Sequence, residues 1–83
     1  MKLTQMLNIG KGLERKLVHA GIATAEELRR IGSEEAFVRI KAHFPNVCLV
    51  HLMALEGAVT GTEYNQLPEE RKRELKALSD GGA

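Results

Sequence analysis

The 83-residue sequence predicts an all-α fold: a small single-domain bundle of five to six short helices that begins with a helix-hairpin-helix-like motif. Apolar residues recur at helical spacing along most of the chain. Glycines, prolines and capping residues separate these segments at short intervals. No segment shows the apolar–polar alternation of a half-buried strand. We therefore treat residues 1–83 as one domain without an internal repeat or linker.

The hairpin, residues 3–22, is expected to contain a short first helix, a tight turn at residues 7–12 and a second helix over residues 11–20. A glycine at the bend accepts positive φ and lets another backbone come close. Gly21 ends the second helix, and Ile22 then inserts into the core as a hydrophobic contact that follows the helix.

Two further helices follow the hairpin. Thr24 and Glu27 form a capping box, in which the threonine hydroxyl accepts from the third amide and the glutamate reaches back. The helix that they open ends at Gly32. Ser33 is expected to cap the next helix, which Pro45 blocks, because a proline biases the preceding residue away from helical dihedrals.

The most apolar segment, residues 47–60, is predicted to be the buried central helix, with Asn46 as its N-cap. Gly57 within it costs about 1 kcal/mol relative to alanine, and we expect the close approach of a neighbouring helix to explain it. Pro68 opens the last helix as a first-turn proline. The tail, residues 79–83, is expected to be disordered.

Composition limits the function. Twelve Lys and Arg residues against eleven Asp and Glu residues give a net charge of +1, well short of the basic balance of a dedicated nucleic-acid binder. The single cysteine, Cys48, excludes an internal disulfide and favours a reducing, cytoplasmic location. The first residues lack the apolar region of a signal peptide, and the longest apolar run, residues 47–54, is too short to span a bilayer. We therefore expect no membrane contact.

The hairpin carries the candidate binding site. The amides that open a helix have no intrahelical partner and can point at a phosphate, and residues 1–23 hold four basic residues against one acidic residue. Phosphate contacts position a protein without reading sequence, so we expect weak, salt-sensitive binding to the DNA backbone. The candidate nucleic-acid-binding residues are Asn8, Gly10, Lys11, Gly12, Arg15 and Lys16. The alternative interpretation is a purely structural hairpin in a protein–protein adaptor that associates with itself as a homodimer.

Catalysis and metal binding find little support. Cys48 and His51 lie one helical turn apart, but a closed zinc site needs four ligands and there is no second close pair. We expect a small buried thiol and a partly buried histidine, with no metal, no cofactor and no catalytic residue. The basic run 71–73 lies among glutamates and is interpreted as a solvated helix face.

Taken together, the pattern from about Leu3 to Leu78 resembles the C-terminal domain of the TfoX (Sxy) family of bacterial proteins, which is associated with the regulation of natural competence. The resemblance implies an all-helical domain, similar also to the C-terminal domain of the bacterial RNA polymerase α subunit. The residues that carry it are Leu7-Asn8-Ile9-Gly10, Leu17, Ala20-Gly21-Ile22, Thr24, Glu27-Leu28, Gly32, Glu35-Ala36, Cys48-Leu49, Leu52, Ala54-Leu55-Glu56-Gly57-Ala58, Gly61 and Leu67-Pro68.

The chain departs from related hairpins at two places. DNA-gripping hairpins usually read Gly-hydrophobe-Gly, whereas Asn8 stands in the place of the first glycine; asparagine tolerates left-handed dihedrals better than most residues. Gly12 is an additional glycine. Full-length family members also carry an N-terminal domain, so a role that needs both domains is not implied. The function that we expect is a non-catalytic regulatory module.

Overall fold

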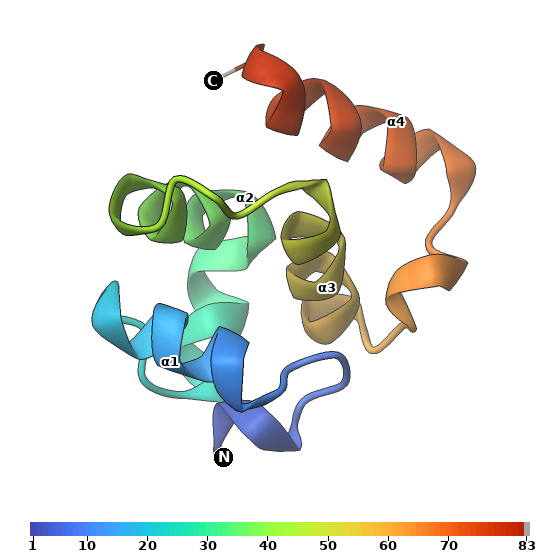
Figure 1. The fold of residues 1–83 in the computed structure, drawn as a ribbon. Helices are drawn as coiled ribbons and strands as arrows, with labels where there is room; N and C mark the ends of the chain where they lie inside the picture. Colours follow the sequence, from blue (N-terminus) through green and yellow to red (C-terminus); the bar gives the residue numbers. More distant parts are fainter. Residues whose placement is uncertain (83) are drawn as a thin grey trace.

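The computed structural model describes residues 1–82, which fold into four α-helices and three short helical turns (Figure 1). This part of the chain contains no strand, and the predicted all-α class is confirmed. In chain order the elements are η1 (Leu3–Gln5), α1 (Lys11–His19), α2 (Ala25–His43), α3 (Leu49–Thr60), η2 (Tyr64–Gln66), α4 (Glu69–Ala77) and η3 (Leu78–Gly82).

The predicted number of five to six helices is too high. The first segment is a 3₁₀ turn of only three residues. The two helices predicted on either side of Gly32 form one element, α2, which is kinked at this glycine (φ 86°, ψ 165°). The predicted break is therefore present in the backbone: Gly32 leaves the helical conformation, and two helical segments meet at this kink within the span of α2.

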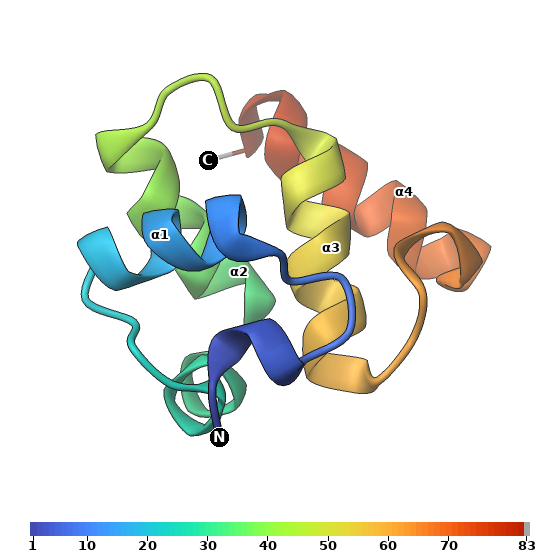
Figure 2. The ribbon, with the colours of Figure 1, turned by 60° about the horizontal axis from the view of Figure 1, so that its bottom comes forward.

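The helices form a compact arrangement in which α1 crosses α2 and α3 lies beside α2 (Figure 1). Figure 2 shows the same neighbours and places the loop between η1 and α1 against the C-terminal half of α3. Helix α4 packs on α3, on the side away from α1. The extents of the molecule are 29 × 25 × 20 Å.

The end of the hairpin and the start of the next helix both follow from local sequence. Gly21 has φ 88°, and the Ile22 amide donates to the Leu17 carbonyl at 2.8 Å, which is the glycine-terminated helix end that the sequence predicts. Ile22 is buried in the core. At the next helix start, the Thr24 hydroxyl accepts from the Glu27 amide at 3.1 Å, which confirms the threonine half of the predicted capping box. The Glu27 carboxylate reaches back to the Ala23 amide, at 3.4 Å, rather than to the Thr24 amide.

Two predicted caps are wrong. Ser33 does not cap a helix, since no backbone amide within residues 1–82 donates to its hydroxyl, which instead donates to the Glu56 carboxylate at 2.6 Å. Helix α3 begins after Cys48 rather than after Asn46. At this start the Cys48 amide donates to His51 Nδ1 at 3.1 Å, and the Lys41 ammonium donates to the carbonyl of the preceding Val47 at 3.0 Å.

The central position of α3 is confirmed. Leu52, Leu55 and Ala58 are buried in the core, and Gly61, with φ 74°, ends the helix in the left-handed conformation. At the chain end, residues 78–82 form a π-helical turn where the sequence predicts a disordered tail, and Ala83 lies outside the described residues. The buried apolar core is formed by Leu3, Met6, Ile9, Leu17, Ile22, Ala25, Leu28, Ala36, Phe37, Ile40, Val47, Leu52, Leu55, Ala58, Leu67 and Leu75.

Candidate nucleic-acid interface

The start of α1 presents open backbone amides. Its N-cap, Gly10, has no side chain to satisfy them, and no partner within residues 1–82 accepts from the amides of Lys11, Gly12 and Leu13. Gly10 and Gly12 are exposed, and a Cβ at either position would meet no atom within 4 Å. An anion can therefore approach these amides from solvent.

The left-handed residue of the turn is Asn8, with φ 71°. Gly10 has φ −92° and ψ −178°, which is extended backbone, so the positive φ expected of a glycine at this bend occurs two residues earlier. Asparagine is one of the few residues with a side chain that adopts this conformation readily. The hairpin therefore turns without the first glycine of related motifs.

The side chain of Asn8 points inward and ties the hairpin to the end of α3. Its Nδ2 donates to the Thr62 carbonyl at 3.0 Å and lies 3.5 Å from the Ala54 carbonyl. Its Oδ1 accepts from the Tyr64 amide at 3.4 Å. Both polar atoms of the side chain are thus used inside the protein, and Asn8 positions the hairpin instead of offering its own side-chain amide to a ligand.

Gly57 leaves the space that the Asn8 side chain occupies. A Cβ built on Gly57 would collide with Asn8 Nδ2 and with the Thr62 carbonyl oxygen. The close approach expected at this glycine is present, but the neighbours are an asparagine side chain and a loop carbonyl rather than another helix. Asn8 and Gly57 together form what we call the Asn8–Gly57 contact.

The three basic residues of the site differ in their surroundings. Lys11 and Arg15 are exposed, one helical turn apart on the same face of α1, and neither forms an ion pair within the described residues 1–82. Lys16 instead lies over the Phe44 ring, with its Nζ 5.6 Å from the ring centroid. The open amides are therefore flanked by two unpaired cations, with the third held against α2.

Sequence reasoning missed an ionic cluster that joins α2, α3 and α4. The Arg71 guanidinium makes two hydrogen bonds to the Glu56 carboxylate, at 3.0 and 3.1 Å, and others to Glu34 at 2.8 Å and to Glu74 at 3.0 Å. Arg71 holds the pKa of Glu56 below its usual range, an effect that the Ser33 hydroxyl supports and burial opposes. The interpretation of Arg71 as part of a solvated face is therefore wrong, and the glutamate inside the apolar segment 49–60 was the available signal.

Cys48 and His51 lie together at the start of α3. The Cys48 Sγ is 3.6 Å from His51 Nδ1, which also accepts from the Cys48 amide at 3.1 Å. Burial lowers the pKa of His51, and the nearby Lys16 ammonium lowers it further. The predicted buried thiol is wrong, since Cys48 is exposed, whereas His51 is partly buried as expected. Among the described residues, no group of three potential ligands could hold a metal ion.

None of the described helices is both long and apolar enough to cross a membrane. Comparison with known proteins adds further findings. The sequence model of the TfoX C-terminal domain matches residues 1–78. A search of curated proteins found no match.

Two solved structures are closely similar to this chain. One is the crystal structure of an uncharacterized protein from Listeria monocytogenes in a triclinic form, with 46% identity and a TM-score of 0.94, covering 96% of this chain and 91% of that chain. The other is a protein of unknown function from Listeria monocytogenes in a tetragonal form, with 47% identity and a TM-score of 0.93, covering 95% and 96% of the two chains.

Proposed function

Because the chain belongs to the TfoX C-terminal domain family, we propose that it is a non-catalytic regulatory module whose hairpin contacts the nucleic-acid backbone weakly and without sequence specificity. The role in natural competence that the family resemblance implies is part of this proposal. The proposal rests chiefly on one observation: the open amides at the start of α1 lie beside Lys11 and Arg15, two exposed cations without an ion pair in the described part of the chain.

The chemistry of this surface favours backbone contact over base recognition. Backbone amides and flexible cations bind phosphate oxygens, which are the same for every sequence. The net charge of +1 supplies little long-range attraction. We therefore expect a dissociation constant of about 10⁻⁴–10⁻⁶ M at physiological salt, with affinity that falls steeply as salt rises.

The test compares two charge-reversal variants by fluorescence anisotropy of labelled DNA, supplied as duplex and as single strand over a series of salt concentrations. Lys11→Glu combined with Arg15→Glu should abolish binding. Both side chains are exposed on α1, so the fold is preserved, which makes this pair preferable to one that includes Lys16. Arg73→Glu combined with Lys76→Glu, on the exposed face of α4, is the matched control and should bind nearly as well as the parent.

The outcomes separate the competing interpretations. A parent that binds neither form of DNA at low salt refutes the proposal, and a concentration-dependent dimer in the same preparation then supports the adaptor. Equal losses in the two double variants mean diffuse electrostatic attraction, which contradicts a hairpin site. A single variant at Lys11 or Arg15 that still binds should show a salt slope smaller by about one for each phosphate that it no longer neutralises.

A further inference from the structure

We propose that Tyr64 and Leu7 form a base-stacking surface beside the hairpin, and that this surface makes the protein a ligand of single-stranded rather than double-stranded nucleic acid. The inference rests on the proposed function, because it names the form of nucleic acid that the same region of the molecule binds. Four properties of the region lead to it: proximity, exposure, charge, and the weakness of the phosphate contacts alone.

The first property is proximity. Turn η2 is 56 residues from Asn8 in the sequence, yet the Tyr64 amide donates to Asn8 Oδ1 at 3.4 Å. The loop that leads into α1 and the segment that contains η2 both lie at the same end of α3 (Figures 1 and 2). The Asn8–Gly57 contact thus fixes the aromatic residue next to the turn that carries the proposed phosphate site.

The second property is exposure. Tyr64 is 43% exposed and Leu7, which precedes Asn8, is 40% exposed. The other two aromatic side chains pack on the core, since Phe37 is buried and Phe44 is partly buried against it. The chain contains no tryptophan. Tyr64 is therefore the residue that can offer a ring face to a base, and every base presents a π face to such a ring.

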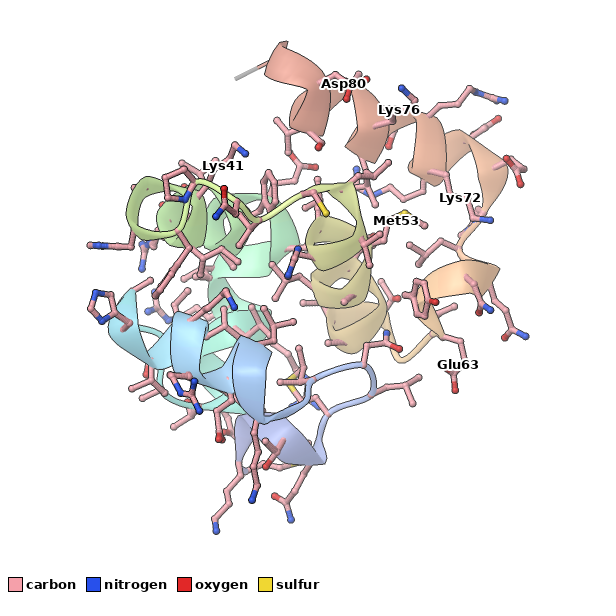
Figure 3. All side chains as sticks on the ribbon, viewed as in Figure 1. Lys41, Met53, Glu63, Lys72, Lys76 and Asp80 are labelled. Atoms are coloured by element: carbon pink, nitrogen blue, oxygen red, sulfur yellow. The ribbon has the colours of Figure 1, made fainter. Side chains whose placement is uncertain are left out.

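The third property is positive charge next to the turn. Lys11 follows the turn and forms no ion pair within residues 1–82. On α4, the Lys72 ammonium donates to the Asn65 carbonyl at 3.4 Å and pairs with Glu69 at 3.6 Å, so it is already engaged inside the protein. Glu63 and Lys72 extend to opposite sides of η2 (Figure 3). Lys11 is therefore the cation that we assign to a phosphate of the strand whose base stacks on Tyr64.

The fourth property separates single strands from duplexes. Bases in a duplex are stacked on one another and paired, so a surface tyrosine gains nothing from them, whereas an unpaired base can leave its neighbours and stack on the ring. The few cations of the hairpin give only weak phosphate binding. Stacking on Tyr64 supplies affinity that a duplex does not receive, and it does so without sequence preference.

The experiment uses the whole chain, a short oligothymidine and a duplex of the same length, all at low salt. Tyr64 is the only tyrosine and there is no tryptophan, so its intrinsic fluorescence reports on this residue alone. We expect oligothymidine to quench the fluorescence and to bind more tightly than the duplex. The variants Tyr64→Ala and Tyr64→Phe contain no tyrosine, so the fluorescence anisotropy of a labelled oligothymidine measures their binding. Tyr64→Ala should weaken binding of the single strand about fivefold to tenfold, and Tyr64→Phe, which keeps the ring, should retain it.

Val38→Ala is the matched control, because Val38 is 53% exposed on α2 and should leave binding unchanged. Equal affinity for the single strand and the duplex refutes the stacking surface and leaves the proposed function standing. The same conclusion follows if Tyr64→Ala still binds the single strand while Lys11→Glu combined with Arg15→Glu does not. Binding of neither form refutes the proposed function, and the stacking surface with it.

Discussion

Replacing Gly57 with alanine tests the contact that positions the hairpin. Helix propensity alone predicts a gain of about 1 kcal/mol, because alanine is the better helix former. The structure predicts the opposite sign. The new Cβ collides with Asn8 Nδ2 and with the Thr62 carbonyl oxygen. Thr62 cannot retreat easily, since its amide donates to the Gly57 carbonyl at 2.8 Å and forms part of the end of α3.

The magnitude follows from two costs. Overpacking costs about 1–3 kcal/mol. Expelling Asn8 leaves the partly buried partners of its side chain without hydrogen bonds, which costs about 1–3 kcal/mol more. After subtraction of the helix-propensity gain, we expect Gly57→Ala to lower the free energy of unfolding by about 1–5 kcal/mol. For a chain of this size each kcal/mol lowers Tm by about 4–8 °C.

Urea denaturation followed by far-UV circular dichroism measures the change, with a thermal melt as a second readout. The matched control is Gly12→Ala in α1, where a Cβ meets no atom within 4 Å and alanine should stabilise the protein by about 0.5–1 kcal/mol. Adding Asn8→Gly, which keeps the left-handed turn and removes one of the two collisions, should recover part of the loss in Gly57→Ala. A Gly57→Ala variant as stable as Gly12→Ala would refute the Asn8–Gly57 contact.

Three further predictions concern the core, the ionic cluster and the thiol. Leu55→Ala should cost about 2–5 kcal/mol in urea denaturation, because Leu55 is fully buried in α3; a loss no larger than that of a surface substitution would contradict the central position of that helix. Arg71 lowers the pKa of Glu56 in the folded protein. This carboxylate therefore stabilises the fold above its unfolded pKa, about 4.3, and loses that contribution as pH falls through the lower folded pKa. The stability advantage of the parent over Glu56→Gln should shrink on acidification, and a difference that does not change with pH would contradict the ion pair. Native mass spectrometry should detect no stoichiometric zinc, and one tightly held zinc that is lost in Cys48→Ser would overturn this expectation.

Much of the fold could be predicted because it depends on residues close together in sequence. The left-handed end of α1 needs only Gly21 and the apolar residue after it, and the cap at Thr24 needs only an amide three residues later. The bend at Gly32 and the end of α3 at Gly61 have the same local origin, since both glycines have positive φ. Each of these features was predicted correctly.

The start of α3 shows where local prediction failed. Asn46 is a good capping residue by type, but it lies in a turn in which the Val47 amide donates to the Phe44 carbonyl at 3.1 Å and the Lys41 ammonium donates to the carbonyls of Pro45 and Val47. Helix α3 begins after Cys48 instead, where the Cys48 amide donates to His51 Nδ1 at 3.1 Å. Cysteine is not among the preferred capping residues, so cap preferences did not predict this boundary.

The candidate site likewise contains some features that the local sequence predicts and others that depend on distant contacts. The open amides follow from a glycine N-cap, and the basic residues on α1 follow from helical spacing. The sequence was therefore sufficient to predict these residues as a candidate site. The ligand that they bind stays a prediction. The inward direction of Asn8 and the place of Tyr64 beside the turn depend on contacts across 54 and 56 residues of chain. No local pattern contains them.

By itself, the sequence determined the helical class, most helix ends and the apolar faces, because helix formation, capping and burial periodicity act over a few residues. Only the tertiary structure decided which polar side chains were used inside the protein. Arg71 could have been a solvated cation and Asn8 a surface turn residue. Packing α3 against both the hairpin and α4 brought Glu56 to Arg71 and Gly57 to Asn8. A partly buried polar group requires a partner, and that partner came from a distant part of the chain.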